Sequence, residues 1–173
     1  DESPVTRYIF KIAVMTNAAL IGQEDVQKDL MLADYILAKL DGCDDYSLAR
    51  VDVPGKNIRF QKIFDGIKSF RRKFRGRFAL QIMFIDENKK YAPAMAKIAA
   101  EISPDEVQIN TPLRPGGAKP LSQAELAEIK EYFQGLSATT VYERKRREAK
   151  PLDEKKTILR HGNFKKKAKS WQA

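Results

Sequence analysis

The chain alternates short apolar runs with longer stretches in which apolar residues recur every three or four positions. The short runs predict five strands, at residues 9–16, 35–40, 78–85, 106–110 and 138–142. The longer stretches predict four helices, at residues 25–33, 58–74, 91–102 and 123–133. Because strands and helices alternate along the chain, the pattern predicts an α/β fold of parallel βαβ units with right-handed crossovers.

Local signals mark the ends of two of these helices. Ser122 is a good N-cap, and Glu125 three residues later completes a capping box. Gly76 follows the helix at 58–74 and is expected to be its C-terminal stop. The apolar stripe of that helix consists of Ile63, Ile67, Phe70 and Phe74.

The composition is that of one domain of ordinary size, with 173 residues and 43% apolar content. No apolar run reaches the ~18 residues that a membrane helix needs, and the start has no signal-peptide pattern. We therefore expect a cytoplasmic protein with no membrane partner. The first residue is not Met, which suggests a processed chain or an excised piece.

The net charge of +9 is unevenly distributed. Residues 142–173 hold twelve Lys or Arg and four Asp or Glu, so the rest of the chain is nearly neutral. A basic tail of this kind can bind RNA or another polyanion, and the plainer interpretation is a solvated chain end. We expect the tail, and not the body, to govern non-specific polyanion binding.

Several kinds of chemistry are excluded by residue counts. Cys43 is the only cysteine and His161 the only histidine, so one chain has no disulfide framework and no cysteine or histidine set for a metal. Cys43 is expected to be a free thiol. No Gly-rich phosphate loop and no credible Ser/His/Asp arrangement is present. Asp44 and Asp45 are expected to lie in a solvated turn.

Polar residues follow or end the predicted strands. In parallel α/β sheets and barrels, ligands gather at the C-terminal ends of the strands, so these side chains could converge on one polar ligand. Asp41 could accept ribose hydroxyls, and Met83 could pack against an adenine ring. Each residue also has a purely structural interpretation, such as capping a turn. The candidate ligand-binding residues are Thr16, Asn17, Lys39, Asp41, Gln81, Met83, Gln108, Asn110 and Thr111, with Arg114 as a candidate contact for an acidic group.

A family resemblance is carried by segments that occur in order and at matching intervals. They are residues 13–17, 40–41, 81–86 and 105–115, followed by 119–122, 141–143 and 150–154. Together they resemble the second half of radical S-adenosylmethionine proteins of the iron–sulfur oxidoreductase type, over roughly residues 9–160. The Asn-Thr-Pro-Leu-Arg-Pro run at 110–115 is the most specific of them.

The resemblance implies a partial TIM-like barrel. Family members have about six strands, a CxxxCxxC loop that holds a [4Fe–4S] cluster, and a Gly-Gly-Glu-Pro element on the second strand. Neither motif occurs in this chain, so residues 1–141 would be the C-terminal half of the barrel, with about five strands, and residues 142–173 a basic strand end and tail. The intact parent would use S-adenosylmethionine and the cluster to generate a radical that takes hydrogen from a substrate.

The resemblance also assigns a role to the candidate residues. They would form one wall of the S-adenosylmethionine site, and Arg114 would reach the substrate. The chain alone is expected to bind no cofactor tightly and to be inactive. Two positions depart from the family pattern: Ala18 stands where Gly is usual, and Lys39 where Ser or Asn is common. Lys39 could pair with a carboxylate or neutralise Asp41.

Two other functions stay open. One is a nucleic-acid-binding α/β protein, based on the tail and on a basic helix face of Lys68, Arg71, Arg72 and Arg75. The other is a non-catalytic interaction module. If the chain is the C-terminal half of a barrel, the strand at 9–16 lacks the preceding strand of the parent and exposes an apolar edge, unless residues 1–8 fold back over it. We therefore expect a partner at this edge, either a missing N-terminal half or a second copy of the chain, and no stable monomer.

Overall fold

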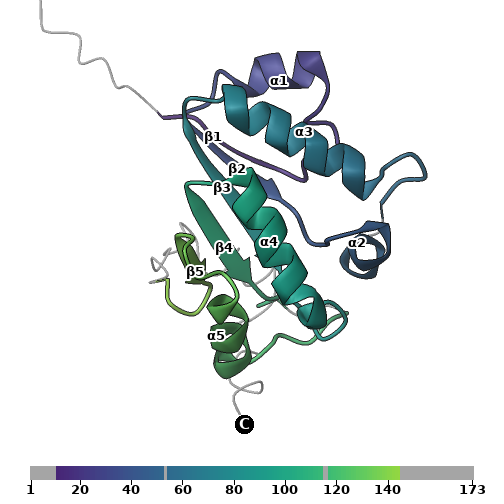
Figure 1. Ribbon diagram of the computed structural model, residues 1–173, viewed down its shortest axis with the longest axis vertical. Helices are drawn as coiled ribbons and strands as arrows, with labels where there is room; N and C mark the ends of the chain where they lie inside the picture. Colours follow the sequence, from purple (N-terminus) through teal and green to yellow (C-terminus); the bar gives the residue numbers. More distant parts are fainter. Residues whose placement is uncertain (1–10, 53, 115–116, 145–173) are drawn as a thin grey trace, which may run out of the picture.

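The computed structural model describes residues 11–52, 54–114 and 117–144. Five parallel strands form one sheet in the order β1-β2-β3-β4-β5 (Figure 1). The strands are β1 Ala13–Thr16, β2 Tyr35–Lys39, β3 Arg77–Met83, β4 Glu106–Asn110 and β5 Ala138–Thr140. The helices are α1 Glu24–Leu30, α2 Asp45–Val51, α3 Phe60–Lys73, α4 Ala92–Ile102 and α5 Gln123–Glu131, with a short 3₁₀ helix η1 at Lys89–Tyr91. The expected α/β class is confirmed.

The helices cover one face of the sheet. Sequential strand order with right-handed crossovers places every connecting helix on the same side, as Figure 1 shows. Alternate strand residues point to this side and form the core with the helices. They are Ile36, Ala38, Phe78, Leu80, Ile82, Val107 and Ile109. The residues between them point to the opposite face, called here the inner face, because it would line the interior of a barrel.

Two of the local sequence signals are confirmed. The stripe of α3 is buried, with Ile67 and Phe70 at 0% exposure. Helix α5 begins with the capping box: the Glu125 amide donates to Ser122 Oγ at 3.2 Å, and the Ser122 amide donates to Glu125 Oε2 at 2.8 Å. Both helices are therefore positioned by the residues that the sequence singles out.

Two sequence expectations are wrong in detail. Asp44 and Asp45 do not lie in a solvated turn, because Asp44 caps α2 by accepting the Ser47 amide at 2.6 Å. Gly76 is not a left-handed helix stop, because α3 already ends at Phe74 with φ −71° and ψ 129°. Gly76 is needed for a close approach instead, since a Cβ there would lie 2.7 Å from the Asp34 carbonyl oxygen.

The strand expected at 9–16 begins at Ala13, and its first two residues lie outside the described part of the chain. The tail from residue 145 onward also lies outside it. Among the described helices, none has the length and apolarity required to cross a bilayer.

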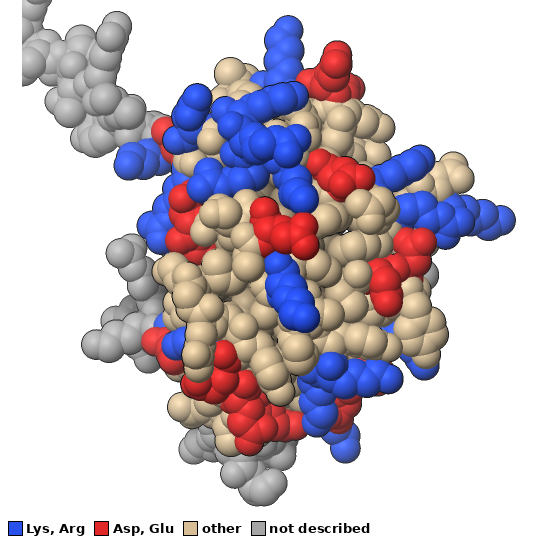
Figure 2. Space-filling model, viewed as in Figure 1, with Lys and Arg blue, Asp and Glu red and all other residues tan. Residues whose placement is uncertain are grey.

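Figure 2 shows Lys and Arg side chains gathered in the upper left of the view, over the adjacent ends of α1 and α3.

Candidate functional site

The sheet register brings several candidate residues together on the inner face. Lys39 pairs with Gln81, and Gln81 pairs with Gln108, so the three form one row across β2, β3 and β4. One step closer to the C-terminal edge, Met83 pairs with Asn110. Side chains of paired residues in parallel strands share a face. The register therefore places these five residues on the inner face, near the C-terminal edge of the sheet.

Asp41, which follows β2, has a buried structural position. Its side chain has 0% exposure, and its Oδ1 accepts the Met83 amide at 2.7 Å. Lys39 Nζ lies 3.0 Å from Asp41 Oδ2, so Lys39 neutralises Asp41, as one interpretation of the sequence expected. Asn88 closes this cluster by donating to the carbonyl oxygens of Asp41 and Met83, at 3.2 and 2.8 Å.

The electrostatics of this cluster are dominated by burial. Burial raises the pKa of the Asp41 carboxyl, and the Lys39 ammonium and the Met83 amide oppose that rise without cancelling it. For Lys39, burial works to lower the pKa, but the Asp41 and Asp52 carboxylates outweigh it and hold the pKa above its ordinary value. Lys39 therefore lies at the C-terminal edge as the ion-pair partner of Asp41, with 29% of its side chain exposed.

Thr16 and Asn17 cap the turn after β1. Thr16 Oγ1 accepts the Ala18 amide and Asn17 Oδ1 accepts the Ala19 amide, each at 3.1 Å. Ala18, which follows Asn17, is fully buried with φ +58°, in the left-handed region that favours glycine. The left-handed backbone at Ala18 is the conformation expected where the family that the sequence resembles usually has Gly.

The residues after β4 divide into structural and exposed ones. Thr111 has 3% exposure, and its Oγ1 accepts the Leu121 amide at 2.8 Å. Asn110 is half-buried, and its carbonyl oxygen accepts the Phe84 amide at 2.8 Å, leaving its side chain on the inner face. Arg114 is exposed. Arg114 therefore shares with the other candidates only its position after a strand end.

An ionic cluster on the inner face was missed by the sequence reasoning. Glu106, only 8% exposed, accepts from Arg77 at 2.8 Å and from Gln108 Nε2 at 3.0 Å, and it also pairs with Arg144. Gln108 Nε2 lies 2.9 Å from the Tyr35 hydroxyl as well. The sequence could have predicted this cluster, because Glu106 and Gln108 are polar residues two positions apart in a strand and therefore share one face.

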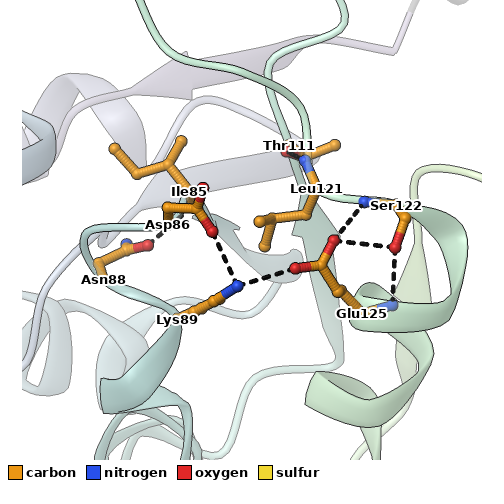
Figure 3. A network of polar contacts seen from close by, with 8 residues as sticks. All are labelled: Ile85, Asp86, Asn88, Lys89, Thr111, Leu121, Ser122 and Glu125. Carbon is orange, nitrogen blue, oxygen red and sulfur yellow. Dashed lines mark hydrogen bonds and ion pairs between the residues drawn. The ribbon is translucent and has the colours of Figure 1, made fainter.

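A second network joins the loops after β3 and β4 at the same edge (Figure 3). Lys89 Nζ lies between Asp86 Oδ1 at 2.7 Å and Glu125 Oε1 at 2.8 Å. Hydrogen bonds from Lys89 and from Ser122 lower the pKa of Glu125 to about 2. The network ties the start of α5 to the loop that precedes α4, and so fixes the rim of the edge.

A hollow in the described part of the chain lies elsewhere, between the loop after β1 and α3. It has a volume of about 650 Å³, and none of the candidate residues lines it. Its lining residues include Leu20, Gly22, Asn57, Lys62, Asp65 and Ser69. On the inner face, Gln81 and Gln108 are themselves buried, at 8% and 7% exposure.

The chain's own residues do not fit an iron–sulfur cluster. Cys43 is half-buried and its Sγ lies 3.5 Å from Ser47 Oγ, whereas such a cluster takes about four thiolate ligands. Across residues 11–52, 54–114 and 117–144, no three His, Cys, Asp or Glu side chains are placed to hold a metal ion. No step of any reaction is therefore assigned to a cluster bound by this chain.

The sheet, its one-sided helices and its polar inner face define part of a TIM-like α/β barrel. Two solved structures share this fold. A domain of pyruvate-formate lyase-activating enzyme from Bacteroides vulgatus matches with a TM-score of 0.61 and 14% identity, over 75% of this chain and 80% of that one. A radical SAM methyltransferase from Sphaerobacter thermophilus matches with a TM-score of 0.54 and 16% identity, over 75% of this chain and 39% of that one.

Similar sequences are found in longer proteins. A UPF0026 protein of Synechocystis is 35% identical over 111 residues, 64% of this chain and 41% of that protein. The GTPase Obg of Brachyspira hyodysenteriae is 31% identical over 129 residues, and a UPF0026 protein of Methanocaldococcus jannaschii 29% over 121 residues. These matches cover 19% and 38% of those two proteins, so the chain spans well under half of each relative. No family model matches the chain.

Proposed function

We propose that this chain is the C-terminal half of the barrel of a radical S-adenosylmethionine iron–sulfur oxidoreductase, and that it forms part of the S-adenosylmethionine and substrate site. The observation that carries the proposal is the pair of inner-face rows, Lys39–Gln81–Gln108 and Met83–Asn110, at the C-terminal edge. The fold shared with a pyruvate-formate lyase-activating enzyme domain and a radical SAM methyltransferase supports it.

The inner-face donors suit S-adenosylmethionine chemically. Gln81 and Asn110 offer amide donors and acceptors for a polar ligand, and Met83 offers an apolar contact for an adenine ring. Gln108, whose Nε2 donates to Glu106 and Tyr35, offers its amide oxygen as an acceptor. Thr16, Asn17, Asp41 and Thr111 would act by holding the turns and strand ends in place, because their side chains bond to backbone amides. When bound, the cofactor would supply the radical that takes hydrogen from the substrate.

The edge of β1 is the proposed position of the rest of the barrel. β1 pairs only with β2 among the described strands, and Ile12 and Met15 are 52% and 63% exposed. A further parallel strand would pair with this edge and cover these side chains. The cluster ligands that this chain lacks would come from that part of the parent protein.

The test is a titration of the ¹⁵N-labelled chain with S-adenosylmethionine, followed by amide shifts. We expect weak, saturable binding, with shifts confined to the amides of Lys39, Gln81, Met83, Gln108, Asn110 and their neighbours. The double variant Gln81→Ala, Gln108→Ala should abolish the shifts. The matched variant Gln61→Ala, Gln134→Ala, with both changes on exposed helix-side positions, should retain them.

Two results would sink the proposal. One is saturable shifts centred on the hollow between the loop after β1 and α3. The other is the same affinity in both double variants, provided that circular dichroism shows both of them folded.

A further inference from the structure

The body of the chain is nearly neutral overall, but its charges are segregated. Residues 66–77, which run from the middle of α3 to the start of β3, hold six Lys or Arg and no acidic residue. Figure 2 shows Lys and Arg side chains gathered over the adjacent ends of α1 and α3. The contact from Lys73 Nζ to Gln27 Oε1, at 3.1 Å, joins the two helices there.

Half of these cations have carboxylate partners. Lys68 pairs with Glu101 at 3.1 Å, Arg71 with Asp105 at 2.8 Å, and Arg77 with Glu106 at 2.8 Å. The first two pairs join α3 to α4 and to the connection after it, and the third joins β3 to β4. Arg72, Lys73 and Arg75 are exposed, and no carboxylate within the described part of the chain pairs with any of them.

Helix stability explains only some of this charge. Cations in the last turn of a helix favour its C-terminus, which accounts for Arg71, Arg72 and Lys73 in the last turn of α3. Arg75 lies beyond the last helical residue, in the connection to β3, where the helix dipole has little effect. The exposed positive charge therefore exceeds what the fold requires.

The exposed part of residues 66–77 presents positive charge but no aromatic ring for contact with a ligand. The aromatic residues interleaved with the cations, Phe70, Phe74 and Phe78, are 0%, 3% and 0% exposed, because they stack in the core. No ring from this segment is available to stack on a base or to enter a lipid layer. Two of the three unpaired cations are arginines, whose planar donor groups match phosphate oxygens.

We propose that Arg72, Lys73 and Arg75, called here the α3 basic surface, bind the phosphate backbone of RNA without reading its sequence. The chain has a net charge of +9 and a pI of about 9.6, but residues 142–173 hold most of that charge. The sequence alone therefore assigned polyanion binding to the tail, and this proposal adds the α3 basic surface of the body to it. A polymer with evenly spaced phosphates can engage both this surface and the basic tail. The surface lies at the N-terminal side of the sheet, since α3 runs antiparallel to the strands, and so it is separate from the candidate site.

The experiment measures binding of the full chain to a fluorescein-labelled RNA duplex by anisotropy, between about 50 and 200 mM salt. The triple variant Arg72→Gln, Lys73→Gln, Arg75→Gln should weaken binding at least about tenfold and reduce the salt slope by about three, roughly one per lost phosphate contact. The control Lys56→Gln, Lys90→Gln, Lys97→Gln removes the same charge from exposed positions elsewhere and should have a much smaller effect.

The single variant Arg75→Gln lies outside α3 and cannot perturb the helix end, so it should reduce the slope by about one even if the triple variant is unstable. Equal losses in the two triple variants would overturn the proposal, because only net charge would then matter. Loss of binding to anionic phospholipid vesicles, with RNA binding unchanged, would overturn the choice of RNA. Loss that depends on the base sequence would overturn backbone recognition.

Discussion

Replacing Asp41 by alanine should destabilise the protein strongly, although Asp41 lies at the end of a strand and not in the apolar core. Its carboxylate accepts the Met83 amide at 2.7 Å and lies 3.0 Å from Lys39 Nζ, at zero exposure. The alanine variant leaves the Met83 amide without its acceptor and Lys39 without its counterion. Because the contact joins the ends of β2 and β3, its loss should also loosen the candidate site.

The magnitude follows from these two losses. A buried amide donor without a partner costs about 1–3 kcal/mol. Lys39 is part-exposed and can be hydrated, so loss of its ion pair adds only about 0–1 kcal/mol. We therefore expect Asp41→Ala to lower the free energy of unfolding by about 1–4 kcal/mol. Asp41→Asn keeps an oxygen for the Met83 amide and should cost about 1 kcal/mol or less.

The comparison between wild type and Asp41→Asn should also depend on pH. Burial raises the pKa of Asp41 in the folded state, so the folded protein holds this proton more tightly than the unfolded chain. The stability that this proton contributes is complete below the unfolded pKa of about 3.9, and it is lost as pH rises through the folded pKa. Asparagine does not titrate, so the advantage of wild type over the variant should shrink as pH rises through that window.

The measurement is urea unfolding followed by circular dichroism, with all three proteins compared at a series of pH values. Glu87→Ala, at an exposed position on the same rim, is a control that should shift the midpoint little. A cost below about 1 kcal/mol for Asp41→Ala would show that the Met83 contact is replaceable by water. An advantage of wild type over Asp41→Asn that grows with pH would show that the folded pKa is lowered and not raised.

Four further outcomes are expected. Gly66→Ala should destabilise by about 1–3 kcal/mol, because the added Cβ would lie 2.8 Å from the Gly22 backbone nitrogen. Ser103→Gly should raise the melting temperature by about 2–4 °C, because Ser103 is exposed at φ +53° after α4. Anaerobic reconstitution should give no stoichiometric iron–sulfur cluster, because Cys43 supplies one ligand. Sedimentation equilibrium should show self-association through the β1 edge.

Each of these expectations has a contrary result. An unchanged urea midpoint for Gly66→Ala would mean that the loop after β1 can move away from α3. A lower melting temperature for Ser103→Gly would mean that the serine side chain stabilises its turn. About four irons per chain would contradict the ligand argument unless several chains share a cluster. A stable monomer with slow amide exchange in β1 would mean that the chain covers this edge itself.

The fold was predictable where one physical effect dominates. Strand and helix periodicity in residues 35–40, 58–74 and 106–110 reflects burial on one side, and the structure confirms the elements there. Helix α2 was not predicted, because its capping pair Asp44 and Ser47 lacks the usual Glu or Gln three residues after the cap. The end of α3 was misjudged because Gly76 is required for a close approach to Asp34 and not for a left-handed turn.

The candidate site was predictable only in part, because strand order decides which distant residues meet. The rule that ligands gather at strand ends identified Lys39, Gln81 and Gln108, and the sheet register aligns them. No local pattern distinguishes Asp41, which bonds to a neighbouring strand, from a residue that faces a ligand. The role of Asn88 was also not predictable from a local pattern. Its side chain donates to the carbonyl oxygens of Asp41 and Met83, which it contacts only because the chain turns back after β3.

The chemistry of the inner face limits what can complete this sheet. The helix-side face is hydrocarbon, but the inner face carries the Glu106 cluster with Arg77 and Arg144, and the Lys39–Asp41 pair. Covering such groups with an apolar layer would cost several kcal/mol per ion unless every charge kept its partner. A second sheet packed flat on this face is therefore unfavourable. The face suits a barrel interior that holds a polar ligand and water, closed along the β1 edge by strands from elsewhere.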